Sequence, residues 1–399
     1  MNFDLHSRTI YLCLSGSHAY GMATPSSDYD YRGIAIPPIA NYIGLLERFE
    51  QAVDGDKGKH VYLNYPVGLL KDDPRVEGAG DSYAPDMQVM ELTKFVRLAL
   101  NNNPSVMETL FTDDSEIVIC KPVMEELLRN RDKLLSKQAK ARFCGYAVSQ
   151  LNRIKRHKRW LDNPPTHKPT REEFGLPDQS LLSQDQFGAA NALIQRELDE
   201  FMVDQTHLPE DVKIELGAAL GRSMRAIWSA LHTDVPYPVG EGQKFETTED
   251  ALYWGAAKDQ GFSENFLEAL TREKQYRTAK REWDQYQTWL RQRNEARAEL
   301  EKKFGFDTKH ASHLVRLLRM AREILTEGKV RVKRPDAEEL LAIRQGAWSY
   351  EKIIEFAERE DEALNDVVKN CKLPKIPDMK FFDNLVREMV LRCQTMSSR

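Results

Sequence analysis

The stretch SGSHAYGMATPSSDYDY, residues 15–31, contains a glycine-rich turn followed by two closely spaced aspartates. The apolar run before it, RTIYLCL (8–14), and the run that contains the aspartates, DYDYRGIAI (28–36), both have the composition of buried strands. Side chains two residues apart in a strand share a face, so we expect Asp28 and Asp30 to point the same way, with Cα atoms about 6.5–7 Å apart. Such like charges repel each other unless cations lie between them.

This aspartate pair and the turn together predict a site for metal ions and phosphate. Carboxylate oxygens are natural ligands of Mg²⁺, which usually shares its coordination shell with substrate phosphates. Gly16 permits close backbone approach and exposed N–H groups that can bind an anion, and Ser17 adds a hydroxyl donor. The arrangement therefore meets the needs of phosphoryl or nucleotidyl transfer. The alternative is a surface turn in which Ser26, Ser27 and Asp28 cap backbone groups.

Composition excludes several classes of protein. The formal net charge is −5 over 399 residues, so any attraction to nucleic acid must come from a local basic surface. No apolar run approaches the length of a membrane span, and the first residues, MNFDLHSRTI, lack the layout of a secretion signal. The five cysteines are scattered without a Cys-x-x-Cys pair, which disfavours a disulfide framework or a zinc finger. We therefore expect a cytoplasmic protein without a membrane partner.

The remaining pattern predicts an α+β fold, with a mixed sheet at the N-terminal end and mainly helices after it. Residues 1–120 are expected to form one domain, and residues 121–399 a helical region with an insertion at about 170–300. The other expected elements are a mostly irregular segment at 50–86 with one strand at 60–63, a third strand at 87–90, a helix at 91–100, helix breaks at 163–177, 235–242 and near Gly305, one long charged helical stretch at 264–303, and a strand at 329–333.

The signature Gly16-Ser17-x-x-x-Gly21, followed by Ser27-Asp28-x-Asp30-x-x-Gly33, resembles that of the DNA-polymerase-β-like nucleotidyltransferase superfamily. KFVRLALNNNPSVMETLF (94–111) and the segment 306–346 resemble a bacterial and phage branch of this superfamily, some of whose members are associated with RNA repair. The resemblance covers roughly residues 10–160 and 304–360.

This resemblance implies a nucleotidyltransferase catalytic domain and assigns roles to its motif residues. Asp28 and Asp30 would bind two Mg²⁺ ions, with Mn²⁺ as a possible substitute, and Gly16, Ser17 and Ser27 would contact a nucleoside triphosphate. A third carboxylate on a later strand serves the catalytic metal in the superfamily. Asp86 is our first choice for it and Glu91, at the start of the next helix, is our second.

A strongly basic helical segment follows the predicted domain. Between residues 129 and 160 eleven positive side chains stand against one acid. Its densest part is expected to contact RNA or the triphosphate, whereas the alternative is a solvated helix face paired with acids elsewhere. The candidate nucleic-acid contacts are Arg153, Lys155, Arg156, Lys158 and Arg159.

A second helix, within residues 306–320, carries candidate contacts to the nucleotide. Helical spacing places Lys309, His313 and Arg316 on one face. The resemblance favours a nucleotide-facing role for Lys309 and His313, and Arg316 would suit the phosphates. His310 and His313 also form a His-x-x-His pair, but the sequence does not identify the further ligands that zinc needs. A histidine hydrogen-bonded inside the helical core is the alternative for His310.

The leading hypothesis is a Mg²⁺-dependent enzyme that transfers a nucleoside monophosphate from a nucleoside triphosphate to a hydroxyl group. An RNA 3′ end, such as that of a damaged tRNA, is the favoured acceptor, and a protein hydroxyl is the alternative. Two other hypotheses are a non-catalytic RNA-binding module on the same fold and an interaction scaffold built on residues 264–303. Neither the oligomeric state nor the choice among ATP, CTP, GTP and UTP is readable from the sequence.

Overall fold

The computed structural model describes residues 3–25, 27–45, 48–53, 86–180, 183–201, 263–293 and 295–396. Contacts divide the chain into two compact units. The first comprises Met1–Pro164 together with Asn294–Arg399, and the second comprises Pro165–Arg293. The boundary near residue 120 and the insertion at about 170–300 stay predictions.

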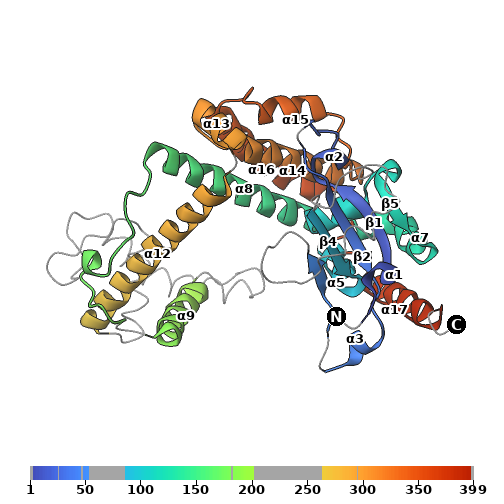
Figure 1. Cartoon of the computed structure of the whole chain (residues 1–399), viewed down its shortest axis with the longest axis horizontal. Helices are drawn as coiled ribbons and strands as arrows, with labels where there is room; N and C mark the ends of the chain where they lie inside the picture. The colour runs from blue at the N-terminus through green and yellow to red at the C-terminus, as the bar shows by residue number, and fades with distance from the viewer. Residues whose placement is uncertain are drawn as a thin grey trace, which may run out of the picture. The chain divides into compact units, whose positions relative to one another are not determined.

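The first unit is built on a mixed sheet that has five strands in the described part of the chain (Figure 1). The strand order is β3-β4-β2-β1-β5. The pair β2 and β4 is parallel, whereas β1 runs antiparallel to β2 and β5, and β3 runs antiparallel to β4. The strands are β1 (Thr9–Ser15), β2 (Asp30–Ala35), β3 (Gln51–Val53), β4 (Asp86–Glu91) and β5 (Ile117–Cys120).

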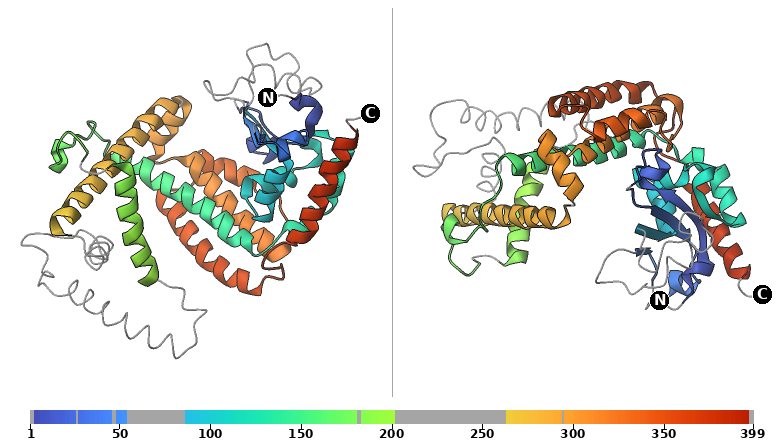
Figure 2. Two further views of the ribbon diagram at one scale, coloured as in Figure 1. Left: turned by 90° about the horizontal axis from the view of Figure 1, so that it is seen from below. Right: turned by 45° about the horizontal axis from the view of Figure 1, so that its top comes forward.

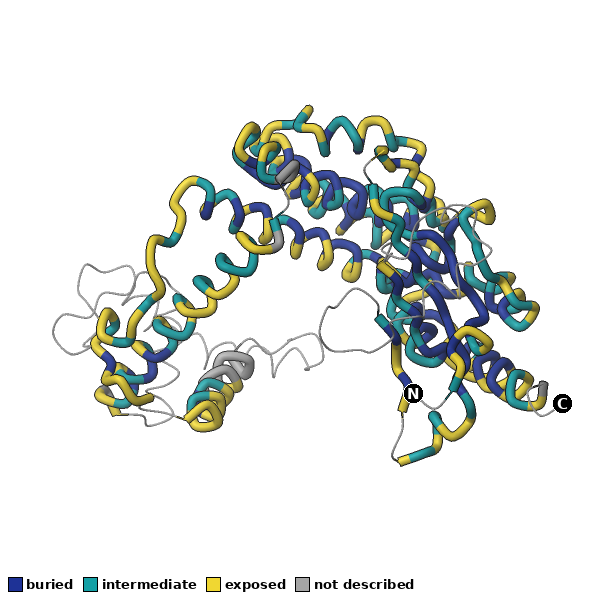
Figure 3. The backbone as a smooth tube through the Cα atoms, in the orientation of Figure 1, coloured by how far each residue is buried: buried dark blue, intermediate teal, exposed yellow. Residues whose placement is uncertain are grey.

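Both faces of this sheet are buried, because apolar side chains occupy alternate positions on both sides of the strands. Along β1, Tyr11 and Cys13 belong to the larger core with the helices, whereas Leu12 and Leu14 belong to a smaller cluster on the other face. In Figure 3 the central strands are accordingly among the most buried segments. This double burial explains why residues 8–14 read as an unbroken apolar run.

Helices of the same unit supply most of the larger core. Helix α14 packs against α8 and α16, and these long helices run side by side in Figure 2. The helices are α1 (Leu5–Arg8), α2 (Gly16–Ala19), α3 (Ala40–Ile43), α5 (Leu92–Leu100), α6 (Pro104–Leu110), α7 (Pro122–Arg129), α8 (Gln138–Asp162), α13 (Glu295–Phe304), α14 (Thr308–Glu327), α15 (Ala337–Arg344), α16 (Tyr350–Asn370) and α17 (Met379–Met396), with 3₁₀ turns η1 (Asp114–Glu116) and η2 (Arg131–Leu134).

Local sequence signals define the ends of helix α14. Asp307 caps its start by accepting a hydrogen bond from the backbone N–H of His310 at 3.0 Å. Gly328 ends it with a φ of 66°, in the left-handed region that glycine enters without steric cost. The Asp307 cap fixes where the helix begins, and therefore where the side chains of its first turn lie.

The second unit contains η3 (Glu172–Phe174), α9 (Gln184–Phe201) and α12 (Glu264–Gln292) in its described residues. A buried ion pair joins Arg171, next to η3, to Glu273 of α12, with 2.5 Å between Nη2 and Oε1. Arg277, one turn further along α12, also contacts Glu273. The pair orders the segment before η3 against α12.

The structure confirms the expected fold class and the predicted strands at 8–14, 28–36 and 87–90, with shifts of one or two residues at their ends. The helix at 91–100 and the breaks near 163 and 305 are also present. The stretch 264–303 is interrupted at residue 293, between α12 and α13. The predicted strand at 60–63 and the break at 235–242 lie outside the described residues.

The prediction of a strand at 329–333 is wrong, because this segment is an irregular loop between α14 and α15. Val332 is buried, and not all charged side chains near it face solvent. Arg334, just beyond, is buried and ion-paired with Glu323 and Asp336. The alternation of charges and valines therefore reflects loop packing.

Among the described residues, no helix combines the length and the apolarity that crossing a bilayer requires.

Candidate active site

Two of the predicted acidic residues lie at the starts of neighbouring strands. Asp30 opens β2 and Asp86 opens β4, and the parallel register pairs their Cα atoms. Neighbouring strands are about 4.8 Å apart and residues in register project to the same side, so the two carboxylates lie within reach of a common ion. Asp28 precedes β2, which begins only at Asp30, and its side chain is exposed.

The electrostatic environment of Asp30 identifies the charges that gather around it. Burial raises the pKa of the Asp30 carboxyl above its usual value, and the negative charges of Asp86 and Asp28 act in the same direction. The cations Arg32 and Lys309 oppose this shift of the pKa. Three carboxylates around a partly buried position form an oxygen donor set that fits a hard divalent cation such as Mg²⁺.

Gly16 brings the backbone against the Asp30 carboxylate. Its φ is +65°, a conformation that favours glycine, and a Cβ atom placed on it would overlap Oδ2 of Asp30. The preceding residue, Ser15, is in register with Asp30 across β1 and β2, which fixes the approach. Ser17 follows in the single-turn helix α2 and is partly exposed. The Gly-Ser pair therefore lies beside the acidic residues.

Ser27 is part of the turn that leads from α2 to the acidic residues. Its Oγ accepts a hydrogen bond from the backbone N–H of Thr24 at 2.9 Å, so it makes the kind of contact that the surface-turn alternative predicted. His18 stacks on Tyr29 with ring centroids 4.1 Å apart, and its Nε2 lies 3.4 Å from the Ser27 carbonyl oxygen. These contacts hold the turn against the segment that carries Asp28.

The sequence analysis did not identify His18 and Arg32 as residues near the candidate site. Arg32 is two residues after Asp30 on β2, and its Nη1 lies 3.4 Å from Oδ1 of Asp86 and donates to the Asp86 carbonyl oxygen at 3.2 Å. No spacing rule links an arginine of one strand to an acid more than fifty residues later. The one signal in the sequence was the position of Arg32 itself, inside the signature segment DYDYR (28–32).

Glu91, the second choice for the third carboxylate, has a structural role instead. It caps α5, and its carboxylate accepts hydrogen bonds from the backbone N–H groups of Thr93 at 2.5 Å and Lys94 at 2.8 Å. It is buried and lies at the far end of β4 from Asp86, about 16 Å along the strand. This geometry favours Asp86 over Glu91 as the third acid.

Helix α14 contributes Lys309 to the surroundings of the acids, since Lys309 affects the pKa of Asp30. Arg316 is fully buried, with Nη1 2.5 Å from Oε1 of Glu108 and its guanidinium 3.7 Å from the centre of the Tyr20 ring. Because the Arg316 guanidinium is buried and paired with Glu108, it does not reach a phosphate at the acidic residues. The predicted phosphate contact of Arg316 is therefore replaced by a link from α14 to α6 and to the end of α2.

His313 is partly buried and contacts the same network. Its Nδ1 lies 2.9 Å from Nη2 of Arg316. Burial, and then the positive charge of Arg316, hold the pKa of His313 well below its usual value, so the ring is neutral at physiological pH. His313 faces Arg316 whereas His310 faces Asp307, so the two histidines of the His-x-x-His pair have different partners.

The basic residues of α8 occupy more than one environment. Arg153, Lys155 and Arg159 are exposed. Lys155 and Arg159, one turn apart, lie opposite the buried His157. Arg153 lies on the side of His157, and its charge acts on His313 of α14. Arg156 is half-buried over the Trp160 ring. Lys158 pairs with Asp162 at 3.0 Å. Three of the five predicted contacts are therefore exposed, on two sides of the helix.

Comparison with known proteins gives one match. Residues 2–162 match the family described as RNA repair pathway DNA polymerase beta family, RlaP. The match spans the sheet residues described above, the acidic residues and helix α8. No curated protein and no solved structure is significantly similar to the chain.

Proposed function

We propose that the chain transfers a nucleoside monophosphate from a nucleoside triphosphate to a hydroxyl group of RNA, because residues 2–162 match the RNA repair pathway DNA polymerase β family, a polymerase-β-like nucleotidyltransferase family. The observation that carries the proposal is the pairing of Asp30 with Asp86 on parallel strands, with Gly16 against the Asp30 carboxylate. Glycine at this position lets the backbone of the turn lie directly against the Asp30 carboxylate, where its N–H groups can contact a bound phosphate.

The three acids supply the oxygen ligands for two divalent ions. Asp28, Asp30 and Asp86 would hold Mg²⁺, and Mn²⁺ could replace it. When bound, the ions would neutralise the charge of the triphosphate and align the attacking and leaving oxygens. The acceptor hydroxyl oxygen forms a bond to the α-phosphorus, the bond to the bridging oxygen of the β-phosphate breaks, and pyrophosphate leaves. Asp86, the more exposed of the register pair, is placed to accept the hydroxyl proton.

The phosphate groups need donors and positive charge. We assign the backbone N–H groups of the turn at Gly16 and the hydroxyl of Ser17 to the β- and γ-phosphates. Lys309 provides a cation within the electrostatic range of Asp30. Ser27 and His313 have structural partners and are not assigned a nucleotide contact.

RNA is the acceptor that the observations favour, with a tRNA 3′ end as the leading candidate. The matched family is described by its place in an RNA repair pathway. The exposed side chains of Arg153, Lys155 and Arg159 can bind phosphates of an RNA strand. A protein hydroxyl is the alternative acceptor, and the experiment below separates the two.

The test uses nucleoside triphosphates labelled at either the α- or the γ-phosphate. The full chain is incubated with each of the four triphosphates, Mg²⁺ or Mn²⁺, total RNA and a protein extract. We expect α-label, and no γ-label, to appear on RNA with at least one triphosphate. Label on protein alone would refute the RNA acceptor. Label on neither, or transfer of γ-label, would refute nucleotidyl transfer.

A double variant tests the assigned site in the same assay. Asp28→Ala with Asp30→Ala removes two of the three metal ligands and is expected to abolish labelling. Retained labelling in a protein freed of contaminating transferases would show that the chemistry occurs elsewhere.

A further inference from the structure

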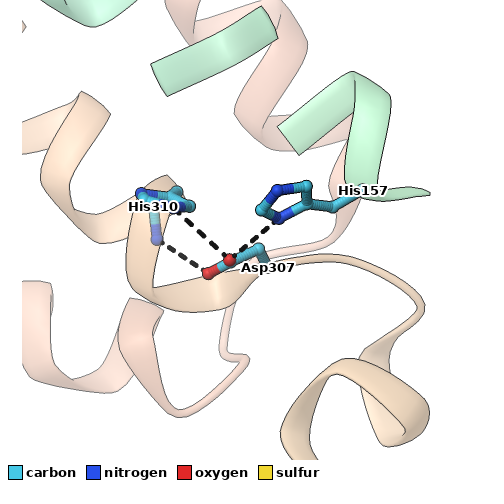
Figure 4. Close-up of side chains that lie close together, drawn as sticks. All are labelled: His157, Asp307 and His310. Carbon is cyan, nitrogen blue, oxygen red and sulfur yellow. Dashed lines mark hydrogen bonds and ion pairs between the residues drawn. The ribbon is translucent and has the colours of Figure 1, made fainter. Parts of the chain in front are cut away.

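Two histidines and an aspartate converge where α8 meets the start of α14 (Figure 4). His157 comes from the last turns of α8, Asp307 caps α14, and His310 lies in the first turn of α14. Asp307 is fully buried, His157 is buried, and His310 is partly exposed. We propose that this cluster binds one Zn²⁺ ion, or a similar borderline divalent ion, at a site separate from the three aspartates.

The distances between the ligand atoms fit one ion. With metal–ligand bonds of about 2.0–2.1 Å, two ligands of a tetrahedral zinc ion lie about 3.4 Å apart. Nδ1 of His157 is 3.3 Å from Oδ2 of Asp307, and Nε2 of His310 is 3.6 Å from the same oxygen. All three ligand atoms lie within 4.8 Å of one another.

Neighbouring groups hold the ligands in this arrangement. Oδ1 of Asp307 accepts the backbone N–H of His310 at 3.0 Å, which leaves Oδ2 facing both imidazoles, as Figure 4 shows. The ring of Trp160 stacks on His157 with centroids 5.5 Å apart and limits its rotation. Loss of a neighbouring group that orients a metal ligand typically lowers metal affinity by about 10–100-fold.

The donor set selects a metal different from that of the aspartate site. Two imidazole nitrogens and one carboxylate favour zinc and its neighbours in the transition series, whereas Mg²⁺ prefers oxygen ligands alone. Among the described residues the cluster supplies three ligands, so a fourth position is left for water, as in zinc sites that are not fully closed by protein. The sequence alone disclosed only His310, because its partner His157 is 153 positions away.

An ion here would tie together segments that are distant in the chain. His157 and Asp307 are separated by 150 positions, and the ion would join the end of α8 to the start of α14. Lys309 lies between two of the ligands in sequence, so the ion would also fix the first turn that carries it. The alternative is a metal-free cluster in which Asp307 bridges the histidines by hydrogen bonds.

The test measures Zn²⁺ binding to the full, untagged chain after metal removal, by competition with a chromophoric chelator. Co²⁺ is added in a parallel experiment because its visible absorption reports the coordination geometry of the bound ion. We expect one high-affinity Zn²⁺ per chain and a Co²⁺ spectrum. His157→Gln and His310→Gln each keep a hydrogen-bond donor toward Asp307 but remove a ligand. We expect each to weaken binding by at least about 100-fold, beyond the usual effect of an orienting partner.

Two controls locate the ion. Asp30→Asn alters the aspartate site and should leave Zn²⁺ affinity unchanged, so this result does not depend on nucleotidyl transfer. His167→Gln removes an exposed histidine and should have no effect. The proposal is overturned if the wild-type chain binds no Zn²⁺, or if both glutamine variants, folded by circular dichroism, bind it as the wild type does.

Discussion

At the scale of single residues, the candidate site depends on one glycine. Gly16→Ala would place a methyl group where Oδ2 of Asp30 lies, in a backbone conformation that costs an L-residue about 1–2 kcal/mol. We expect the Asp30 carboxylate to be displaced and transfer to fall by about 100-fold or more, as for small errors of position at reacting groups. Steady-state rates of RNA labelling measure this loss.

Gly145 provides the matched control for Gly16. It is an exposed glycine of α8, and a Cβ atom there meets nothing within 4 Å. Gly145→Ala should keep full activity and raise the stability of the fold by about 0.4–1 kcal/mol. An equal loss of activity in Gly16→Ala and Gly145→Ala would contradict the claim that transfer depends on the close approach of Gly16 to Asp30.

The protonation of His313 predicts how stability depends on pH. The unfolded chain binds a proton on this ring below pH about 6.5, but the folded chain does not until much lower pH. The unfolded state therefore binds more protons, and stability is lost as the pH falls below about 6.5. His313→Gln should remove up to about 1.4 kcal/mol per pH unit of this slope between pH about 5 and 6.5. Urea unfolding in metal-free buffer checks this prediction, and an unchanged slope would contradict a ring that is neutral in the folded chain.

At the scale of secondary-structure elements, the ion pair of Arg316 and Glu108 links α14 to α6. Glu108→Gln leaves a buried guanidinium without its counter-charge, which typically costs about 3–5 kcal/mol. Glu108→Gln combined with Arg316→Met should regain most of this loss, because neither charge remains buried. Denaturant midpoints of the three proteins test the account.

An exposed pair on α16 serves as the control for that prediction. Asp366→Asn breaks the contact with Lys369, which water already screens, and should leave the midpoint nearly unchanged. If the double variant at 108 and 316 were as unstable as Glu108→Gln alone, an unpaired buried charge would not be the cause.

Helix α8 is the element whose exposed basic side chains we assign to RNA. Replacing Arg153, Lys155 and Arg159 with alanine should weaken RNA binding and lower the slope of log K against log salt by about 2, at about 0.7 per phosphate contact on a single strand. Fluorescence anisotropy at several salt concentrations measures the slope.

The control variant removes three positive charges from a surface away from the basic end of α8. The exposed lysines Lys369, Lys372 and Lys375 lie near Pro374, which contacts Lys137 at the opposite end of α8. Changing these three to alanine should leave the salt slope nearly as it was. An equal effect of both triple variants would indicate non-specific attraction rather than a binding face on α8.

The sequence predicted the elements whose pattern is strong over several residues. β1, β2 and β4 have long apolar or alternating runs, and α5 has a clear helical period. β5 was missed because Ile117–Cys120 has only four residues, next to an acidic turn. The strand expected at 329–333 failed because alternation over five residues does not separate a strand from a packed loop.

At the scale of the whole molecule, the candidate site is assembled from segments that no spacing rule connects. Asp28 and Asp30 could be identified from their own neighbourhood. Asp86 was preferred to Glu91 already from the sequence, but its pairing with Asp30 in the parallel register of β2 and β4 depends on tertiary structure. Likewise, the burial of Arg316 follows from Glu108, which lies about two hundred positions earlier. Long-range pairing therefore accounts for most of what the sequence left open.

Transfer of α-label to RNA by single carboxylate variants tests the central claim most directly. Asp30→Asn and Asp86→Asn remove charge at the two positions that the register pairs, while Glu91→Gln alters an acid that caps a helix. We predict that the first two lose transfer by at least about 1,000-fold, with unchanged folding, whereas Glu91→Gln retains it at temperatures where it is folded. Full activity in Asp30→Asn, or a loss in Glu91→Gln equal to that in Asp86→Asn, would contradict the account.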